Sequence, residues 1–158
     1  MKSIILKIVV SILVVSIAAI LVYRLNDSNQ ATSDGSVRIV IIDELGNTVF
    51  DQDVVYQKDD NFFDAINREF NLTCASSSYE ADDTCSYDFK GFGYQGKVLL
   101  GIANDDFSVQ TDWQNSFLKF EIYDENEYHL TTQGVSDLSF VNQDKIRISY
   151  ASVLEGLS

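Results

Sequence analysis

The chain begins with a long apolar segment, and this segment constrains the organisation of everything after it. Residues 4–23 contain only three polar side chains, Lys7, Ser11 and Ser16. A helix needs about 20 apolar residues to cross the hydrocarbon core of a bilayer, and Lys7 can extend its ammonium group toward the head groups. A helix that packs on a soluble core would place polar residues at a period near 3.6, and this segment does not. We therefore expect a transmembrane anchor over residues 1–24.

A cleaved signal peptide is the alternative interpretation of the same segment. Ser16-Ile17-Ala18 offers small residues at the two positions that a signal peptidase requires. The apolar run continues past this site to Tyr23, which favours an uncleaved anchor. Both interpretations predict that the remainder of the chain is exported.

The distribution of charge predicts the orientation of the anchor. Lys2 and Lys7 precede the span, whereas Arg24 after it is soon followed by Asp27. The positive-inside tendency then keeps the amino terminus cytoplasmic and places the domain outside the plasma membrane. The net charge of −13 repels nucleic acid, so we expect no nucleic-acid partner. A strongly acidic surface also keeps an exported protein soluble.

The exported part divides into a polar tether, one domain and a short tail. Residues 25–35 are polar and lack an apolar period, which is typical of a linker. Residues 36–152 form the predicted domain, and residues 153–158 form the tail. The domain starts with two β-branched, strand-like segments, Val37–Asp43 and Thr48–Tyr56, on either side of a turn. This pattern predicts a β-hairpin.

One helix is expected next. Asp59-Asp60-Asn61 supplies side chains that cap a helix. Phe62, Phe63, Ile66 and Phe70 then recur at helical spacing, and Asn71 can end the helix in a left-handed conformation.

The remaining strands complete an α+β domain. We expect a polar loop over residues 71–92, strands at Gly96–Ile102, Phe117–Tyr123 and Lys145–Tyr150, and a short extended piece at Gly134–Phe140. The order of elements predicts a mixed sheet of about five strands crossed by one helix.

These segments resemble the bacterial surface domain called DUF4430, which is similar to the carboxyl-terminal domain of transcobalamin. The likeness spans Ser36–Tyr150 and is carried by VRIVIIDELGNTVF, DDNFFDAI, GKVLLGI, the Trp of TDW and GVSDLSFVNQDKIRISY. The family usually has Gly-Asp before the last strand, where this chain has Gln143-Asp144, and Asn-Gly where it has Asp124-Glu125-Asn126. The resemblance implies a β-grasp fold and display on the cell surface.

Cys74 and Cys85 are the two cysteines of the chain. Outside the cytosol such a pair is most simply a disulfide that closes a short loop. Neither cysteine has a further Cys or His nearby to complete a zinc site, and the acidic pairs lack the glycine of an EF-hand loop, so we expect no metal and no cofactor.

Aromatic residues gather around the predicted loop. Tyr79, Tyr87, Phe89 and Tyr94 are suited to contacts with a surface protein, a peptide or a carbohydrate. The alternative is that some of them form the buried floor of the loop. We expect a non-enzymatic binding module, because His129 is the one histidine and no Gly-x-Ser-x-Gly turn accompanies it. A corrinoid-like carrier, suggested by the transcobalamin likeness, and an envelope assembly role through the anchor are the alternatives.

Overall fold

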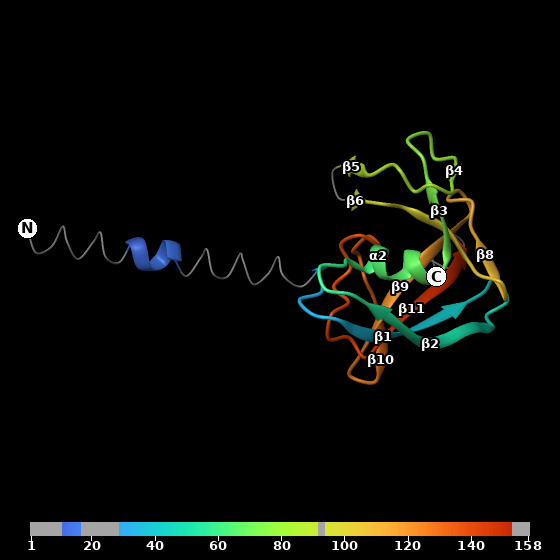
Figure 1. Ribbon diagram of the computed structural model, residues 1–158. Coiled ribbons are helices and arrows are strands. Elements are labelled where there is room, and N and C mark those ends of the chain that lie inside the picture. The colour runs from blue at the N-terminus through green and yellow to red at the C-terminus, as the bar shows by residue number, and fades with distance from the viewer. Residues whose placement is uncertain (1–10, 17–28, 92–93, 153–158) are drawn as a thin grey trace, which may run out of the picture.

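The computed structural model describes residues 11–16, 29–91 and 94–152, and for Gly91, Tyr94 and Gln95 it describes the backbone alone. The domain combines mostly sheet with one helix (Figure 1), so the expected α+β class is confirmed.

A five-stranded mixed sheet has the order β10-β9-β11-β1-β2. Its central strands β1 and β11 are parallel, with Ile39 opposite Ile146, and every other neighbouring pair is antiparallel. The strands are β1 (Gly35–Ile42), β2 (Thr48–Tyr56), β9 (Ser116–Asp124), β10 (Glu127–Leu130) and β11 (Lys145–Ser152). The predicted hairpin is therefore present as β1 and β2.

A second sheet, which the sequence did not predict, has the order β4-β3-β7-β8. It contains β3 (Asn71–Ala75), β4 (Ala81–Asp82), β7 (Leu99–Ala103) and β8 (Ser108–Gln110), and β5 (Phe89–Gly91) pairs with β6 (Tyr94–Gly96) beside it. The prediction of a loop over residues 71–92 is wrong for β3, β4 and β5. β3 is held by a partner distant in sequence, as where Leu72 pairs with Ile102, whereas β4 and β5 are short strands that pair with nearby residues.

Helix α2 (Phe62–Glu69) begins where the capping residues predict. The Asn61 side chain accepts a hydrogen bond from the amide of Asp64 at 2.9 Å, and the Asp64 carboxylate accepts one from the amide of Asn61 at 3.2 Å. The prediction that Asn71 ends the helix in a left-handed conformation is wrong. Phe70 ends it in an extended conformation, and Asn71 starts β3.

One hydrophobic core joins the helix to both sheets. Phe62 and Ile66 of α2 are fully buried in the same core cluster as residues of the central strands β1 and β11. Leu72, Ile102 and Val109 bring the second sheet into the same cluster. Figure 1 shows α2 lying between the two groups of strands. The predicted helix therefore packs its aromatic face as expected, but into a core with two sheet walls.

The segment Gly134–Phe140 does not form the expected extended piece. Residues 135–137 form a turn, and Val135, Leu138 and Phe140 are nevertheless fully buried. Their apolar side chains fill the core from a loop. The sequence pattern of such a loop resembles that of a buried strand, so the sequence does not distinguish the two.

The predicted anchor and tail lie largely outside the described residues. Residues 11–16 are helical, and no helix within the described ranges is long and apolar enough to span a bilayer. The end of the expected tether is packed on the domain. The amide of Ala31 donates to the carbonyl of Asp60 at 2.8 Å, and its carbonyl accepts from the amide of Asp59 at 2.7 Å. Residues 25–28 and 153–158 lie outside the described residues.

Candidate functional site

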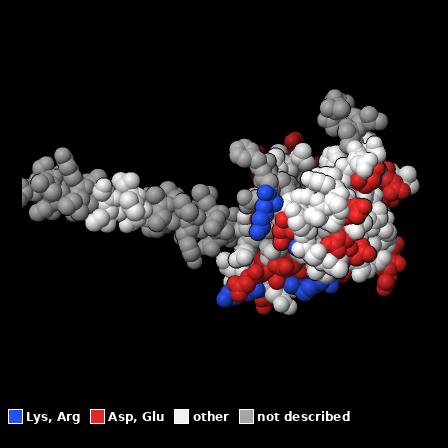
Figure 2. Space-filling view, turned by 90° about the horizontal axis from the view of Figure 1, so that it is seen from above, with Lys and Arg blue, Asp and Glu red and all other residues white. Residues whose placement is uncertain are grey.

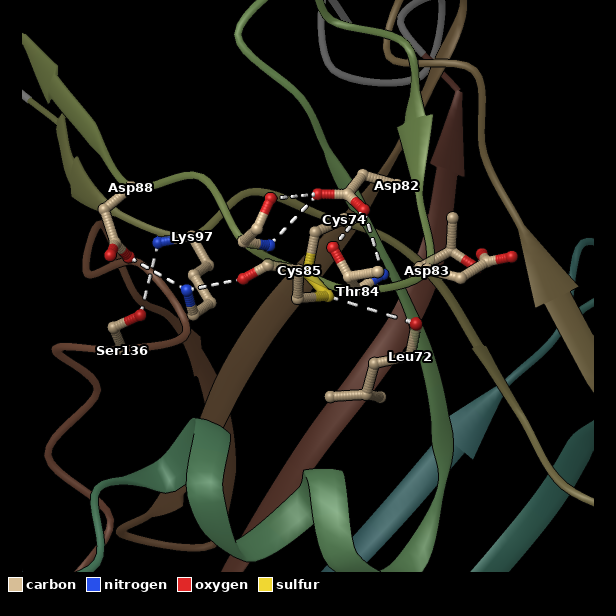
Figure 3. Close-up of a disulfide and its surroundings, with 11 residues drawn as sticks. Leu72, Cys74, Asp82, Asp83, Thr84, Cys85, Asp88, Lys97 and Ser136 are labelled. Atoms are coloured by element: carbon tan, nitrogen blue, oxygen red, sulfur yellow. Dashed lines mark hydrogen bonds and ion pairs between the residues drawn. A yellow bond between two sulfur atoms is a disulfide. The ribbon is translucent and has the colours of Figure 1, made fainter.

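A disulfide between Cys74 and Cys85 closes the loop that carries the candidate site, as predicted (Figure 3). Cys74 lies on β3 and is fully buried, and Cys85 is buried beside it. Because Cys74 belongs to the main core, the disulfide ties the loop to that core.

Asp82 organises the turn between β4 and Cys85. Its carboxylate accepts hydrogen bonds from the amides of Thr84 and Ser86 at 2.9 and 3.0 Å, and from their hydroxyl groups at 2.6 and 2.9 Å. These bonds, with that of the Thr84 hydroxyl first, hold the pKa of Asp82 well below its usual range. Asp82 is therefore ionised at neutral pH, and its carboxylate holds the turn before Cys85 in place.

Lys97 ties the far end of the loop to the body of the domain (Figure 3). Its ammonium group donates to the carbonyl of Cys85 at 2.7 Å, lies 3.2 Å from the carboxylate of Asp88, and sits 5.3 Å from the centre of the Phe63 ring. Phe63 is on α2, so one side chain connects loop, helix and acidic surface.

Three of the four predicted binding aromatics form one cluster. The rings of Tyr79 and Phe89 have centroids 5.2 Å apart, and Tyr87 meets Phe89 edge to face at 4.9 Å. Phe89 rests on Ala75, Val98 and Leu100, whereas Tyr79 and Tyr87 are 57% and 39% exposed. We call Tyr79, Tyr87 and Phe89 the aromatic cluster. The backbone of the fourth predicted residue, Tyr94, lies in β6, and the structure does not describe its side chain.

The backbone at Tyr79 is held in an unfavourable conformation. Its φ of 64° lies in the left-handed region, which costs a residue with a side chain roughly 1–2 kcal/mol. The turn is fixed by hydrogen bonds from the Tyr79 amide to the Ser76 carbonyl at 3.0 Å, and from the Ser76 amide to the Glu80 carbonyl at 2.8 Å. A glycine would adopt this conformation without that cost, so the turn holds the exposed tyrosine at the expense of backbone energy.

A second exposed aromatic, Trp113, was not predicted as a site residue. It also has a positive φ, 59°, and is 41% exposed. Asp112 fixes this turn by accepting hydrogen bonds from the side-chain and backbone amides of Asn115, each at 2.8 Å, which lower its pKa well below the usual range. Trp113 helps to line an apolar pocket of about 200 Å³ with Phe117 and Leu130. The sequence gives the turn-forming Asp and Asn but no sign that the indole stays exposed.

The structure places the other chemical candidates without assembling a reactive site from them. His129 lies on β10 opposite Ile122, and the Ser136 hydroxyl accepts from the amide of Lys97 at 3.2 Å. Among the residues that the structure describes, no group of three or more His, Cys, Asp or Glu side chains is arranged to hold a metal ion.

No protein-family model, no curated protein and no solved structure matches the chain.

Proposed function

We propose that the chain is a membrane-anchored, non-enzymatic recognition module that binds its ligand on the outer side of the membrane through the aromatic cluster. One observation carries this proposal: Tyr79 and Tyr87 are exposed rings, held by Phe89 and a disulfide-closed loop, and Tyr79 is kept in a strained backbone conformation. Rigid aromatic side chains give a large contact area at a low cost in conformational entropy.

Two features support a location outside the cytosol. The apolar segment at residues 4–23 has the composition of a membrane anchor. The Cys74–Cys85 disulfide is of the kind that forms and persists in oxidising compartments. Lys2 and Lys7 precede this segment, and the positive-inside tendency therefore supports a cytoplasmic amino terminus and an extracytoplasmic domain.

The arrangement of the five-stranded sheet is in keeping with the proposed DUF4430-like, β-grasp relationship. An amino-terminal hairpin leads into a helix, and the first and last strands lie side by side and parallel at the centre of the sheet. The disulfide-closed loop that follows β3 carries Tyr79, and Tyr87 and Phe89 of the aromatic cluster come directly after it.

The charge of the surface favours an uncharged or cationic ligand. Figure 2 views the molecule from the side of β4, β5 and β6, and shows acidic side chains bordering a broad uncharged area. The whole chain has a net charge of −13. An anionic ligand would approach against this field.

The test is binding of the full-length chain, in detergent micelles, to printed arrays of glycans and of surface-derived peptides. We expect selective capture by the unmodified protein and its loss in the double variant Tyr79→Ala/Tyr87→Ala. Leu45→Ala is the matched control, because Leu45 is an apolar side chain, 79% exposed, in the β1–β2 turn of the other sheet.

Equal array patterns for the unmodified protein and the double variant, with both still folded by circular dichroism, would show that the aromatic cluster is not the recognition surface. Loss of capture in Leu45→Ala as well would attribute the signal to non-specific apolar contact.

A further inference from the structure

A polar cleft of about 570 Å³ lies on the outer face of the four-stranded sheet. Its polar lining comes from the end of α2, from β3, from β8 and from the disulfide loop: Asn67, Asn71, Thr73, Asp83 and Gln110. A volume of this size is within the range of small-molecule binding sites.

The register of the sheet explains why these side chains converge. Leu72, Ile102 and Val109 belong to the main core, so their neighbours along each strand face the opposite side. Thr73 is opposite Gly101, and Gly101 is opposite Gln110. The polar side chains of three strands thus share one surface.

Gly101 allows the Gln110 side chain, which lines the cleft, to lie close to the sheet. A Cβ atom at this position would come within 2.1 Å of Oε1 and 2.3 Å of Nε2 of Gln110. The Gln110 amide therefore lies directly across the glycine backbone, where any larger residue would displace it.

The lining offers both donors and acceptors but no cation. Amide side chains supply both, and the carboxylate of Asp83 accepts a hydrogen bond from the Thr73 hydroxyl at 2.8 Å, which uses one of its several acceptor positions. No Lys or Arg is among the described residues that line the cleft. Sugar hydroxyl groups, each a donor and an acceptor, match this set, whereas phosphate and carboxylate ligands do not.

The cleft and the aromatic cluster lie on the same face. Ala75, Val98 and Leu100 form a small cluster separate from the main core, on the outer side of β3 and β7, and Phe89 covers it. Asp83 belongs to the same disulfide-closed loop as Tyr79. Hydrogen-bonding groups for hydroxyls are thus combined with aromatic rings that can stack on the apolar face of a sugar.

We propose that this cleft binds one unit of a neutral oligosaccharide and that the aromatic cluster stacks on an adjoining unit. The proposal rests on the recognition function above and names the class of ligand. Asn71 and Gln110 act as hydroxyl-binding residues, and Tyr79 and Tyr87 as the stacking surface.

The test is calorimetric titration of the full-length chain in detergent with chitohexaose, cellohexaose and maltohexaose. We expect at least one of these oligosaccharides to bind. The affinity for it should fall by about tenfold or more in Gln110→Ala, which removes the amide. It should fall similarly in Gly101→Ala, because the added methyl group pushes the Gln110 amide into the cleft. Leu45→Ala should bind as the unmodified protein does. Asn67→Ala, on the exposed face of α2, provides a second cleft variant should a strand variant fail to fold.

Two results overturn the inference. The first is unchanged affinity in folded Gln110→Ala and Asn67→Ala, which would place the sugar elsewhere. The second is the absence of binding to all three oligosaccharides at millimolar concentration. If the arrays then show capture of peptides that depends on Tyr79 and Tyr87, the recognition function stands without this ligand class; if they show no such capture, both proposals fail.

Discussion

Glu121 accepts two hydrogen bonds from the guanidinium group of Arg147, at 2.7 and 2.8 Å, across the β9–β11 pair. The Arg147 side chain also lies 3.8 Å from the centre of the Tyr128 ring. Glu121 is buried on the outer face of the five-stranded sheet, where burial alone would raise its pKa. The hydrogen bonds and the charge of Arg147 outweigh burial, so the pKa of Glu121 lies below its ordinary value of 4.5.

Glu121→Gln should therefore lower the free energy of unfolding and make that free energy fall less as the pH is lowered. Losing a hydrogen-bonded charge at this position should cost about 1–3 kcal/mol at neutral pH. A lowered folded-state pKa contributes stability above the unfolded value of 4.5, and this contribution is lost as the pH falls through the folded value. Urea titrations at several pH values should show a smaller acid loss in the variant. Parallel pH profiles for the two proteins would contradict the assignment.

The disulfide should stabilise the domain substantially. Cys74 and Cys85 are 11 positions apart, and a loop of this size is expected to contribute roughly 3 kcal/mol. We expect Cys74→Ser/Cys85→Ser, and the reduced unmodified protein, to unfold at lower urea concentrations by similar amounts. If a reducing agent left the unfolding midpoint of the unmodified protein unchanged, the disulfide would have no such role.

Replacing the strained tyrosine should separate function from folding. Tyr79→Gly relieves the left-handed backbone, so the free energy of unfolding should stay level or rise by up to about 1 kcal/mol, while array capture is lost. Glu125→Gly is the matched control, since Glu125 also has a positive φ, 49°, in the exposed β9–β10 turn. It should gain stability without any change in capture. A marked loss of stability in Tyr79→Gly alone would identify Tyr79 as a folding residue.

The elements that the sequence predicted are those whose signals are local. β1, β2, β9, β11 and α2 each carry an apolar period of their own, and Asn61 caps the helix through a residue three positions away. The prediction of the disulfide needed only the two cysteines and the expectation that the chain is exported. In physical terms, each of these features is decided by residues close in sequence.

The missed elements are either very short or depend on a distant partner. β4 and β8 are too short to show a period, and β3 becomes a strand by pairing with β7. The sequence identified the aromatic residues of the site, but their convergence on Phe89 needed the second sheet. The polar cleft was not predicted at all, because Asn71, Gly101 and Gln110 meet only through that sheet.

The membrane location can be tested independently of binding. If the leading apolar segment spans the bilayer, as we propose, the full-length chain should pellet with membranes and resist extraction with alkaline carbonate. Protease added to intact cells should remove the domain. Full protection of the domain in intact cells, with cleavage after lysis, would contradict an outward orientation.

Ring-proton NMR during titration with a ligand that the arrays identify tests the central claim most directly. Tyr79 and Tyr87 are in the proposed surface, whereas Tyr123 and Tyr128, with ring centroids 5.1 Å apart on β9 and β10, form an internal control pair. We expect the resonances of the first pair to shift in proportion to bound ligand and those of the second to stay in place. Shifts confined to Tyr123 and Tyr128 would contradict the proposal and place recognition on the five-stranded sheet.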